Sequence, residues 1–186
     1  MLTFSHLSEF KSTEGYWSSF DCVDIAKDIL EITKANSILE IGFNIGYSAS
    51  VWLENGITRL TVIDINNHKD TLPAIRATAA AYASTAYVNW WIGDSKSEEA
   101  YELDIKSIDA CFIDGEHSYD GALNDSWLGI HYGAKWLIYD DVIENHVNGI
   151  HSVISYLESV NTIQIEKRYK MTWTEQGEVV LCRVLI

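Results

Sequence analysis

The chain has 186 residues, of which 47% are hydrophobic and 22% are charged, a composition typical of a globular domain. Its formal net charge of −14 would repel a phosphate backbone, so we expect no nucleic-acid partner. No apolar run approaches the roughly 18 residues that a membrane span requires, and we therefore expect no membrane partner. The first residues show no signal peptide, which favours a cytoplasmic protein.

The three cysteines, Cys22, Cys111 and Cys182, cannot all pair with one another, and none belongs to a C-x-x-C motif. We expect reduced thiols, as in a cytoplasmic protein. The length fits a single domain, which we place over residues 21–186 after a polar N-terminal arm of residues 1–20.

Periodic apolar residues predict that strands and helices alternate along most of the chain. We expect helices over residues 21–33, 47–54, 70–82, 98–103, 119–131 and 149–160. We expect strands over residues 36–41, 60–64, 86–92, 108–114, 134–140, 162–167 and 178–185. Such alternation is typical of an α/β, doubly wound fold with a mostly parallel sheet, here closed by a C-terminal antiparallel hairpin.

One stretch, Ser37–Ser48, combines a buried strand, a glycine turn and the start of a helix. Gly42 and Gly46 permit positive φ angles and a close approach of a ligand to the main chain. Their spacing, Glu40-x-Gly42-x-x-x-Gly46, differs from the G-x-G-x-x-G of dinucleotide enzymes. A carboxylate at Glu40 suits a ligand with a cationic amine or hydroxyl groups, although a plain tight turn would leave the same pattern.

Aspartates fall at or just past the predicted carboxyl ends of several strands, where open α/β sheets bind ligands. Asp64 lies about 20 residues past the glycine turn, a position that reaches ribose hydroxyls in this topology. Asp94, within Gly93-Asp94-Ser95, is placed to accept from an adenine amine. The alternatives are a turn residue for Asp64 and a helix N-cap for Asp94.

Asp114, Asp140 and Asp141 follow two strands that should be neighbours, so their carboxylates should converge. Like charges in one place are costly, and a divalent cation removes that cost. Ligands that are all oxygen favour Mg²⁺, Ca²⁺ or Mn²⁺ over zinc. Otherwise one aspartate caps the next helix and the others face water.

A general base is expected in the loop after Asp114. His117 has a side chain suited to proton transfer near neutral pH, and Glu116 is the alternative. His146 and His151 are weaker candidates, in a region that we interpret as a substrate loop.

The aromatic residues leave two interpretations open. Tyr16 and Trp17, in the N-terminal arm, either close over a ligand or pack against the sheet edge. Trp52, Trp127 and Trp136 fall within predicted elements and are expected in the core.

These residues together resemble the class I S-adenosylmethionine-dependent methyltransferases. The nearest branch contains small-molecule and sugar O-methyltransferases, such as macrocin O-methyltransferase, together with cephalosporin-hydroxylase-type proteins. The resemblance covers residues 21–185, nearly the whole chain. The motifs that carry it are Leu39–Ser48, Asp64, Gly93–Ser95, Phe112–Tyr119, Leu137–Asp141 and Asn148–Val153.

The resemblance implies a Rossmann-like, roughly seven-stranded sheet and methyl transfer from S-adenosyl-L-methionine to an oxygen of a small-molecule acceptor. It implies Mg²⁺ held by Asp114, Asp140 and Asp141, and a base at Glu116 in sugar-modifying relatives. The implied cofactor-binding residues are Glu40, Gly42, Phe43, Asn44, Gly46, Asp64, Ile65, Gly93, Asp94, Ser95 and Asp114.

This chain departs from the catechol-type members, which carry lysine where it has His117 and asparagine where it has Asp141, so catechol acceptors are disfavoured. The short N-terminal arm leaves a substrate lid incomplete or supplied by a partner subunit, as in a possible homodimer. Two other functions stay open, a non-catalytic S-adenosylmethionine-binding module and an NAD-dependent oxidoreductase. The glycine spacing and the lack of a Tyr-x-x-x-Lys pair count against the oxidoreductase.

Overall fold

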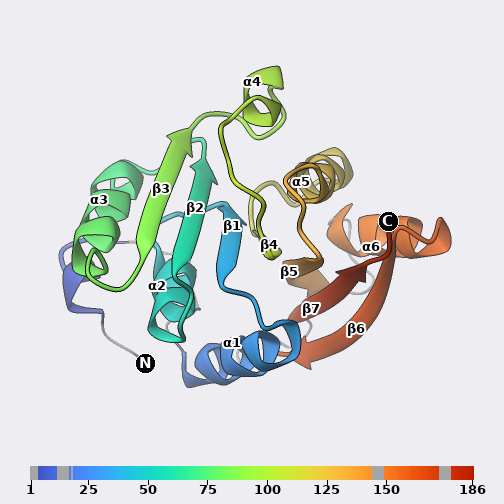
Figure 1. The fold of residues 1–186 in the computed structure, drawn as a ribbon, viewed down its shortest axis with the longest axis horizontal. Coiled ribbons are helices and arrows are strands. Elements are labelled where there is room, and N and C mark those ends of the chain that lie inside the picture. Colours follow the sequence, from blue (N-terminus) through green and yellow to red (C-terminus); the bar gives the residue numbers. More distant parts are fainter. Residues whose placement is uncertain (1–3, 12–16, 18, 144–148, 172–176) are drawn as a thin grey trace.

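The computed structural model describes the chain except residues 1–3, 12–16, 18, 144–148 and 172–176. Within the described residues, seven strands form one sheet in the order β3-β2-β1-β4-β5-β7-β6 (Figure 1). The strands are β1 Ser37–Ile41, β2 Arg59–Asp64, β3 Tyr87–Ile92, β4 Ala110–Ile113, β5 Trp136–Ile143, β6 Ile163–Lys170 and β7 Gly177–Val184. The helices are η1 Ser5–Leu7, α1 Phe20–Thr33, α2 Tyr47–Glu54, α3 Thr71–Ala81, α4 Glu98–Tyr101, α5 Tyr119–His131 and α6 Gly149–Ser159.

The first five strands are parallel, and β7 runs antiparallel to both β5 and β6. This arrangement confirms the predicted α/β, doubly wound, mostly parallel sheet with a C-terminal antiparallel hairpin. The chain winds from β1 outward to β3 and then returns to place β4 on the other side of β1. The order therefore reverses between β1 and β4, the place where folds of this kind bind ligands.

Two apolar clusters cover the two faces of the sheet. One contains residues of α1, α2 and α3, and the other contains residues of α4, α5 and α6. All five residues of β1 are buried, as expected for a strand with helices on both faces. The neighbouring residues Trp90 and Trp91 pack against opposite clusters, which follows from the alternation of side chains along β3.

The N-terminal segment joins the main core. Leu7 and Trp17 are buried in the same cluster as α1 and α2, so Trp17 packs into the core, and its contact with a ligand stays a prediction. Tyr16 lies outside the described residues. Cys22, Cys111 and Cys182 are buried and form no disulfide, as predicted.

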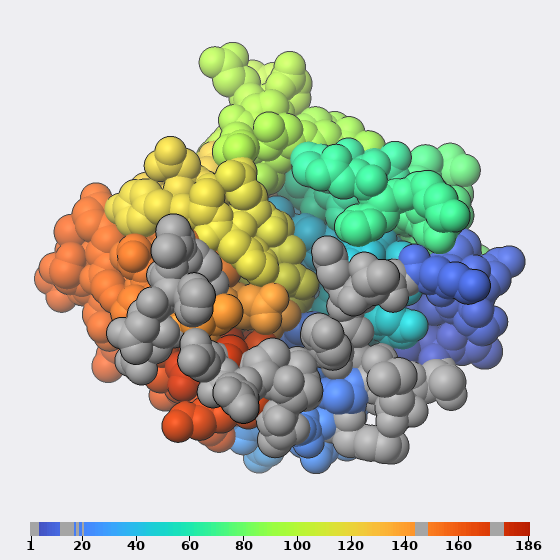
Figure 2. All heavy atoms as spheres, turned by 180° about the vertical axis from the view of Figure 1, so that it is seen from behind, coloured from blue at the N-terminus to red at the C-terminus, as the bar shows by residue number. Residues whose placement is uncertain are grey.

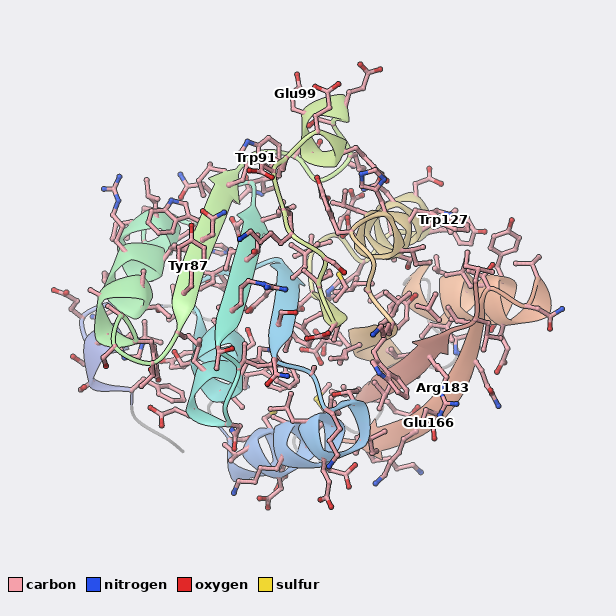
Figure 3. All side chains as sticks on the ribbon, in the orientation of Figure 1. Tyr87, Trp91, Glu99, Trp127, Glu166 and Arg183 are labelled. Atoms are coloured by element: carbon pink, nitrogen blue, oxygen red, sulfur yellow. The ribbon has the colours of Figure 1, made fainter. Side chains whose placement is uncertain are left out.

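Two expectations were wrong. The fifth strand does not end at Asp140 but continues to Ile143, because a bulge between Tyr139 and Val142 lets it pass the two aspartates and keep pairing with β7. Trp127 is 37% exposed and points outward from α5, whereas Trp52 is fully buried (Figure 3). In the part of the chain that the structure describes, no helix is long and apolar enough to cross a membrane.

Candidate active site

A cavity of about 780 Å³ lies at the carboxyl ends of the parallel strands, beside the switch between β1 and β4. Its volume is within the range of roughly 300–1,000 Å³ that small-molecule sites occupy. Seen from behind, atoms around β1 and α2 are visible between the α3 region and the yellow α5 region (Figure 2). The lining comes from residues 41–48, 63–65, 67–68, 93–96, 114–117 and 140–141, with Trp17 and Met171.

The glycine turn after β1 takes the conformation that its sequence demands. Gly42 and Gly46 have φ angles of 89° and 84°, where side chains other than glycine are strained. A Cβ atom at Gly42 would lie 2.1 Å from the backbone oxygen of Asp114, so β1 and β4 approach each other closely there. Gly42, Phe43, Asn44 and Gly46 all line the cavity, and their contact with a cofactor stays a prediction.

The Asp64 carboxylate lies at the end of β2 and binds this turn. Its Oδ2 atom accepts hydrogen bonds from the backbone N–H groups of Phe43 at 2.7 Å and Asn44 at 3.2 Å. Asp64 and Ile65 also line the cavity. Asp64 thus holds the turn in place, and its contact with a ribose stays a prediction.

Glu40 lies behind the turn rather than on the cavity wall. It is fully buried, accepts a hydrogen bond from the Ser48 hydroxyl through Oε1, and has no partner on Oε2 among the described residues. The pKa of this carboxyl is raised to about 8, chiefly by burial. The charges of Asp114 and Asp64 act in the same direction, and the Ser48 bond opposes them. Glu40 is absent from the described residues that line the cavity, so direct ligand contact there stays a prediction.

The loop Gly93–Ser95 lines the cavity beside β3, and a residue that the sequence analysis missed supports it. Ser95 donates its hydroxyl to Oδ1 of buried Asp125 at 2.6 Å, and the Asn124 side chain donates to the Ser95 carbonyl at 2.9 Å. Burial raises the pKa of Asp125 to about 6. Asp125 lies in the middle of α5 between Asn124 and Ser126, where a run of polar residues indicates a solvent-facing segment and gives no signal of burial.

The structure brings together Asp114, His117 and Asp141. Each offers one ligand atom, and the three atoms lie within 4.8 Å of one another. His117 Nε2 is 3.6 Å from Asp114 Oδ1. This cluster differs from the predicted triad of aspartates in holding His117 in place of Asp140, and the triad stays a prediction.

Asp140 lines the cavity but does not belong to this cluster, and its side chain is buried. Its Oδ2 atom accepts a hydrogen bond of 2.5 Å from Nε1 of Trp17. Burial raises the pKa of Asp140 well above its usual value, and the charges of Asp114 and Asp141 act in the same direction. The carboxylates of Asp114, Asp140 and Asp141 are thus close enough to influence one another, and the role of Asp140 as a metal ligand stays a prediction.

The two proposed bases differ in their surroundings. Glu116 forms an ion pair with Lys96 and accepts a hydrogen bond from the Ser118 hydroxyl at 2.7 Å. The Lys96 bond, followed by the Ser118 bond, lowers the pKa of Glu116, which makes it a weaker proton acceptor. His117 lies beside Asp114 at the cavity wall. His151 lies on α6 and is not among the described lining residues, and His146 lies outside the described residues.

The fold is the one expected of a class I methyltransferase. A family model described as a methyltransferase domain matches residues 39–142, more than half of the chain and the whole region from β1 to the β5 aspartates. The chain therefore belongs to this methyltransferase domain family. This result confirms the resemblance drawn from the glycine turn and the strand-end aspartates.

Solved structures share the fold at low sequence identity. A putative O-methyltransferase from Klebsiella pneumoniae is 15% identical, with a TM-score of 0.71 over 95% of this chain and 84% of its own. An O-methyltransferase from Bacillus cereus, solved with S-adenosylhomocysteine (SAH), is 14% identical, with a TM-score of 0.74 over 97% of this chain and 91% of its own. TomG from Streptomyces achromogenes, an O-methyltransferase of tomaymycin synthesis solved with S-adenosylmethionine (SAM), is 18% identical, with a TM-score of 0.72 over 90% of this chain and 81% of its own. Among curated proteins, none matches the sequence.

Proposed function

We propose that this protein transfers a methyl group from SAM to an oxygen atom of a small molecule. The observation that carries the proposal is one cavity lined both by the glycine turn with Asp64 and by the Asp114–His117–Asp141 cluster. Two of the structural relatives were solved with SAM or SAH, which supports the choice of donor.

The donor would lie across the β1–β2 end of the cavity. The backbone from Gly42 to Gly46 would face its amino-acid part, Asp64 its ribose, and the loop at Asp94 and Ser95 its adenine. The acidic side chains of this end suit a donor with a cationic sulfonium and a cationic amine. The sulfonium supplies an electrophilic methyl group, so the protein has mainly to align the acceptor and exclude water.

The acceptor would lie at the β4–β5 end. His117 would accept the proton of the acceptor hydroxyl, since it lines the cavity and Asp114 Oδ1, 3.6 Å from its Nε2, would stabilise the imidazolium that forms. Glu116 is the weaker candidate, since Lys96 and Ser118 already occupy its carboxylate.

A divalent cation fits the same cluster. Two carboxylates and one imidazole nitrogen lie within 4.8 Å of one another. This set mixes oxygen and nitrogen ligands, whereas Mg²⁺ was predicted on oxygen ligands alone. Mn²⁺ accepts the mixed set more readily than Mg²⁺ does. A bound ion would lower the pKa of an acceptor hydroxyl. His117 would then be a metal ligand instead of the base. Assistance by Mg²⁺ or Mn²⁺ is part of this proposal and has a separate test.

The charge of the cavity narrows the acceptor class. Among the described lining residues, Lys96 is paired with Glu116, and the remaining acidic side chains are Asp64, Asp94, Asp114, Asp140 and Asp141. Such a field repels carboxylates and phosphates and tolerates neutral or cationic molecules. We therefore propose a neutral or cationic hydroxyl compound as the acceptor.

The test is calorimetric titration of the purified protein with SAH and, in parallel, with NAD. Saturable binding of SAH alone supports the donor assignment, and turnover of SAM with a panel of neutral, cationic and anionic hydroxyl compounds then tests the acceptor class. Absence of SAH binding would overturn the proposal. A titration with Mn²⁺ alone, repeated on His117→Gln, tests the ion. If the heat of Mn²⁺ binding is lost in His117→Gln, His117 is a metal ligand. If the heat is unchanged and turnover is slower, His117 is the base.

A further inference from the structure

A buried contact joins the N-terminal segment to the floor of the site. Trp17 and Asp140 are only 3% and 4% exposed, and 123 residues separate them in the chain. The indole ring packs against Trp52 and Phe112, with ring centroids 5.1 and 4.9 Å away. This packing directs Nε1 at the Asp140 carboxylate, to which it donates a hydrogen bond of 2.5 Å.

The contact lies at the bulge of β5. Tyr139 pairs with Val180 and Val142 with Glu178, so the two aspartates of β5 stand opposite one residue of β7. Tyr139 and Val142 both belong to the cluster on the α5–α6 face, which a regular strand would not allow for residues three apart. The extra residue therefore redirects the side chains between them.

The bulge redirects the second of the two aspartates, because Asp140 follows the alternation set by Ile138 and Tyr139. Asp140 turns toward the face where Trp17 packs. Asp141 has a φ angle of 49°, a left-handed conformation that costs free energy for any residue with a Cβ atom. In that conformation its carboxylate reaches the ligand atoms of Asp114 and His117.

A buried carboxylate requires hydrogen-bond donors, and the donor that reaches Asp140 from another segment is Trp17. The other oxygen of Asp140 has no partner among the described residues. Loss of the indole N–H would therefore leave the carboxylate poorly satisfied, and the strand could relieve this by letting the bulge relax and Asp140 turn toward water.

We propose that Trp17 is a positioning residue of the site: by binding Asp140 it fixes the bulge of β5, and the bulge holds the Asp141 carboxylate beside Asp114 and His117. The proposal rests on the proposed function in one respect: it takes the Asp114–His117–Asp141 cluster to be the acceptor end of the site. It gives the N-terminal segment a role in arranging that end through Asp140.

The test compares Trp17→Phe with Trp52→Phe. Both changes replace a buried indole of the same aromatic group by phenyl, but the Trp52 Nε1 has no partner among the described residues. Amide hydrogen exchange over residues 139–143 should rise at least tenfold in Trp17→Phe and less than threefold in Trp52→Phe. The imidazole resonances of His117, assigned through His117→Gln and recorded at fixed pH, should shift in Trp17→Phe only.

A second pair of variants tests the contact from the other side. Asp140→Asn keeps an oxygen that accepts from Trp17, so exchange and the His117 resonances should stay near wild type. Asp140→Leu removes the acceptor and should reproduce Trp17→Phe. Equal exchange in the two tryptophan variants, or unmoved His117 resonances in Trp17→Phe, would overturn the proposal.

SAH titration of the same proteins keeps the two proposals apart. Wild-type protein that fails to bind SAH overturns the donor assignment, whatever the exchange data show. An exchange pattern that does not distinguish Trp17 from Trp52 overturns the positioning role, whatever the SAH affinity.

Discussion

At the β1–β2 end of the cavity, the glycine turn and the carboxylate that binds it are 21 residues apart, since Phe43 donates to Asp64. At the β4–β5 end, the contact that orders the aspartates joins Trp17 to Asp140 across 123 residues. The first end follows from one strand–turn–helix unit and the next strand. The second depends on packing between distant segments, so its geometry is decided by the tertiary structure.

The difference predicts where a substitution harms the fold most. Gly42→Ala should lower the free energy of unfolding by at least about 3 kcal/mol, because the new Cβ would lie 2.1 Å from the Asp114 backbone oxygen. Gly56→Ala is the matched control, since Gly56 also has a positive φ but has no atom within 4 Å of an added Cβ. It should cost only about 1 kcal/mol. Urea unfolding measures both, and equal losses would contradict the close approach of β1 and β4.

The second prediction separates the two ends by ligand. Asp64→Ala should weaken SAH binding by about 10- to 100-fold, because two turn N–H groups lose a charged acceptor and the turn loosens. Asp141→Ala should change SAH affinity less than about threefold and abolish turnover, because Asp141 belongs to the acceptor end. Calorimetry measures the SAH affinity of both variants. A large loss of SAH affinity in Asp141→Ala would show that the β4–β5 end also binds the donor.

The sequence predicted the first end well for a physical reason. Glycine conformation, strand ends and the distance between Gly42 and Asp64 are local properties, and they placed the turn, Asp64 and Asp94 on one cavity. At the second end the sequence identified Asp114, His117 and Asp141, but it did not reveal the bulge of β5 that sets the direction of the Asp141 side chain. The role of Asp140 as a metal ligand stays a prediction. Asp125 was missed because its role depends on Ser95, 30 residues away, which only the packed structure reveals.

A pH experiment sharpens the account of the first end. The Glu40 carboxyl has a pKa of about 8 in the folded protein against 4.5 ordinarily. Between these values the folded state binds more protons than the unfolded state, so this carboxyl should lower stability as pH rises from about 4.5 to 8. Glu40→Gln keeps an acceptor for Ser48 and should be more stable than wild type by about 2 kcal/mol at pH 8, with less difference at pH 5. Thermal or urea unfolding at both pH values measures it, and a pH-independent difference would contradict burial as the cause.

The smallest expected effect tests whether distant packing also contributes at the first end. Ser95→Ala removes the hydroxyl that donates to Asp125 at 2.6 Å, and should cost about 1 kcal/mol of stability. Because the loop Gly93–Ser95 lines the cavity, SAH affinity should fall about threefold. The control is Ser8→Ala, which removes an exposed hydroxyl bonded to Ser5 and should cost less than about 0.5 kcal/mol. If Ser95→Ala lowers SAH affinity as much as Asp64→Ala does, the donor end depends on the α5 support as strongly as on its own turn, and the contrast between a local and a distant end no longer holds.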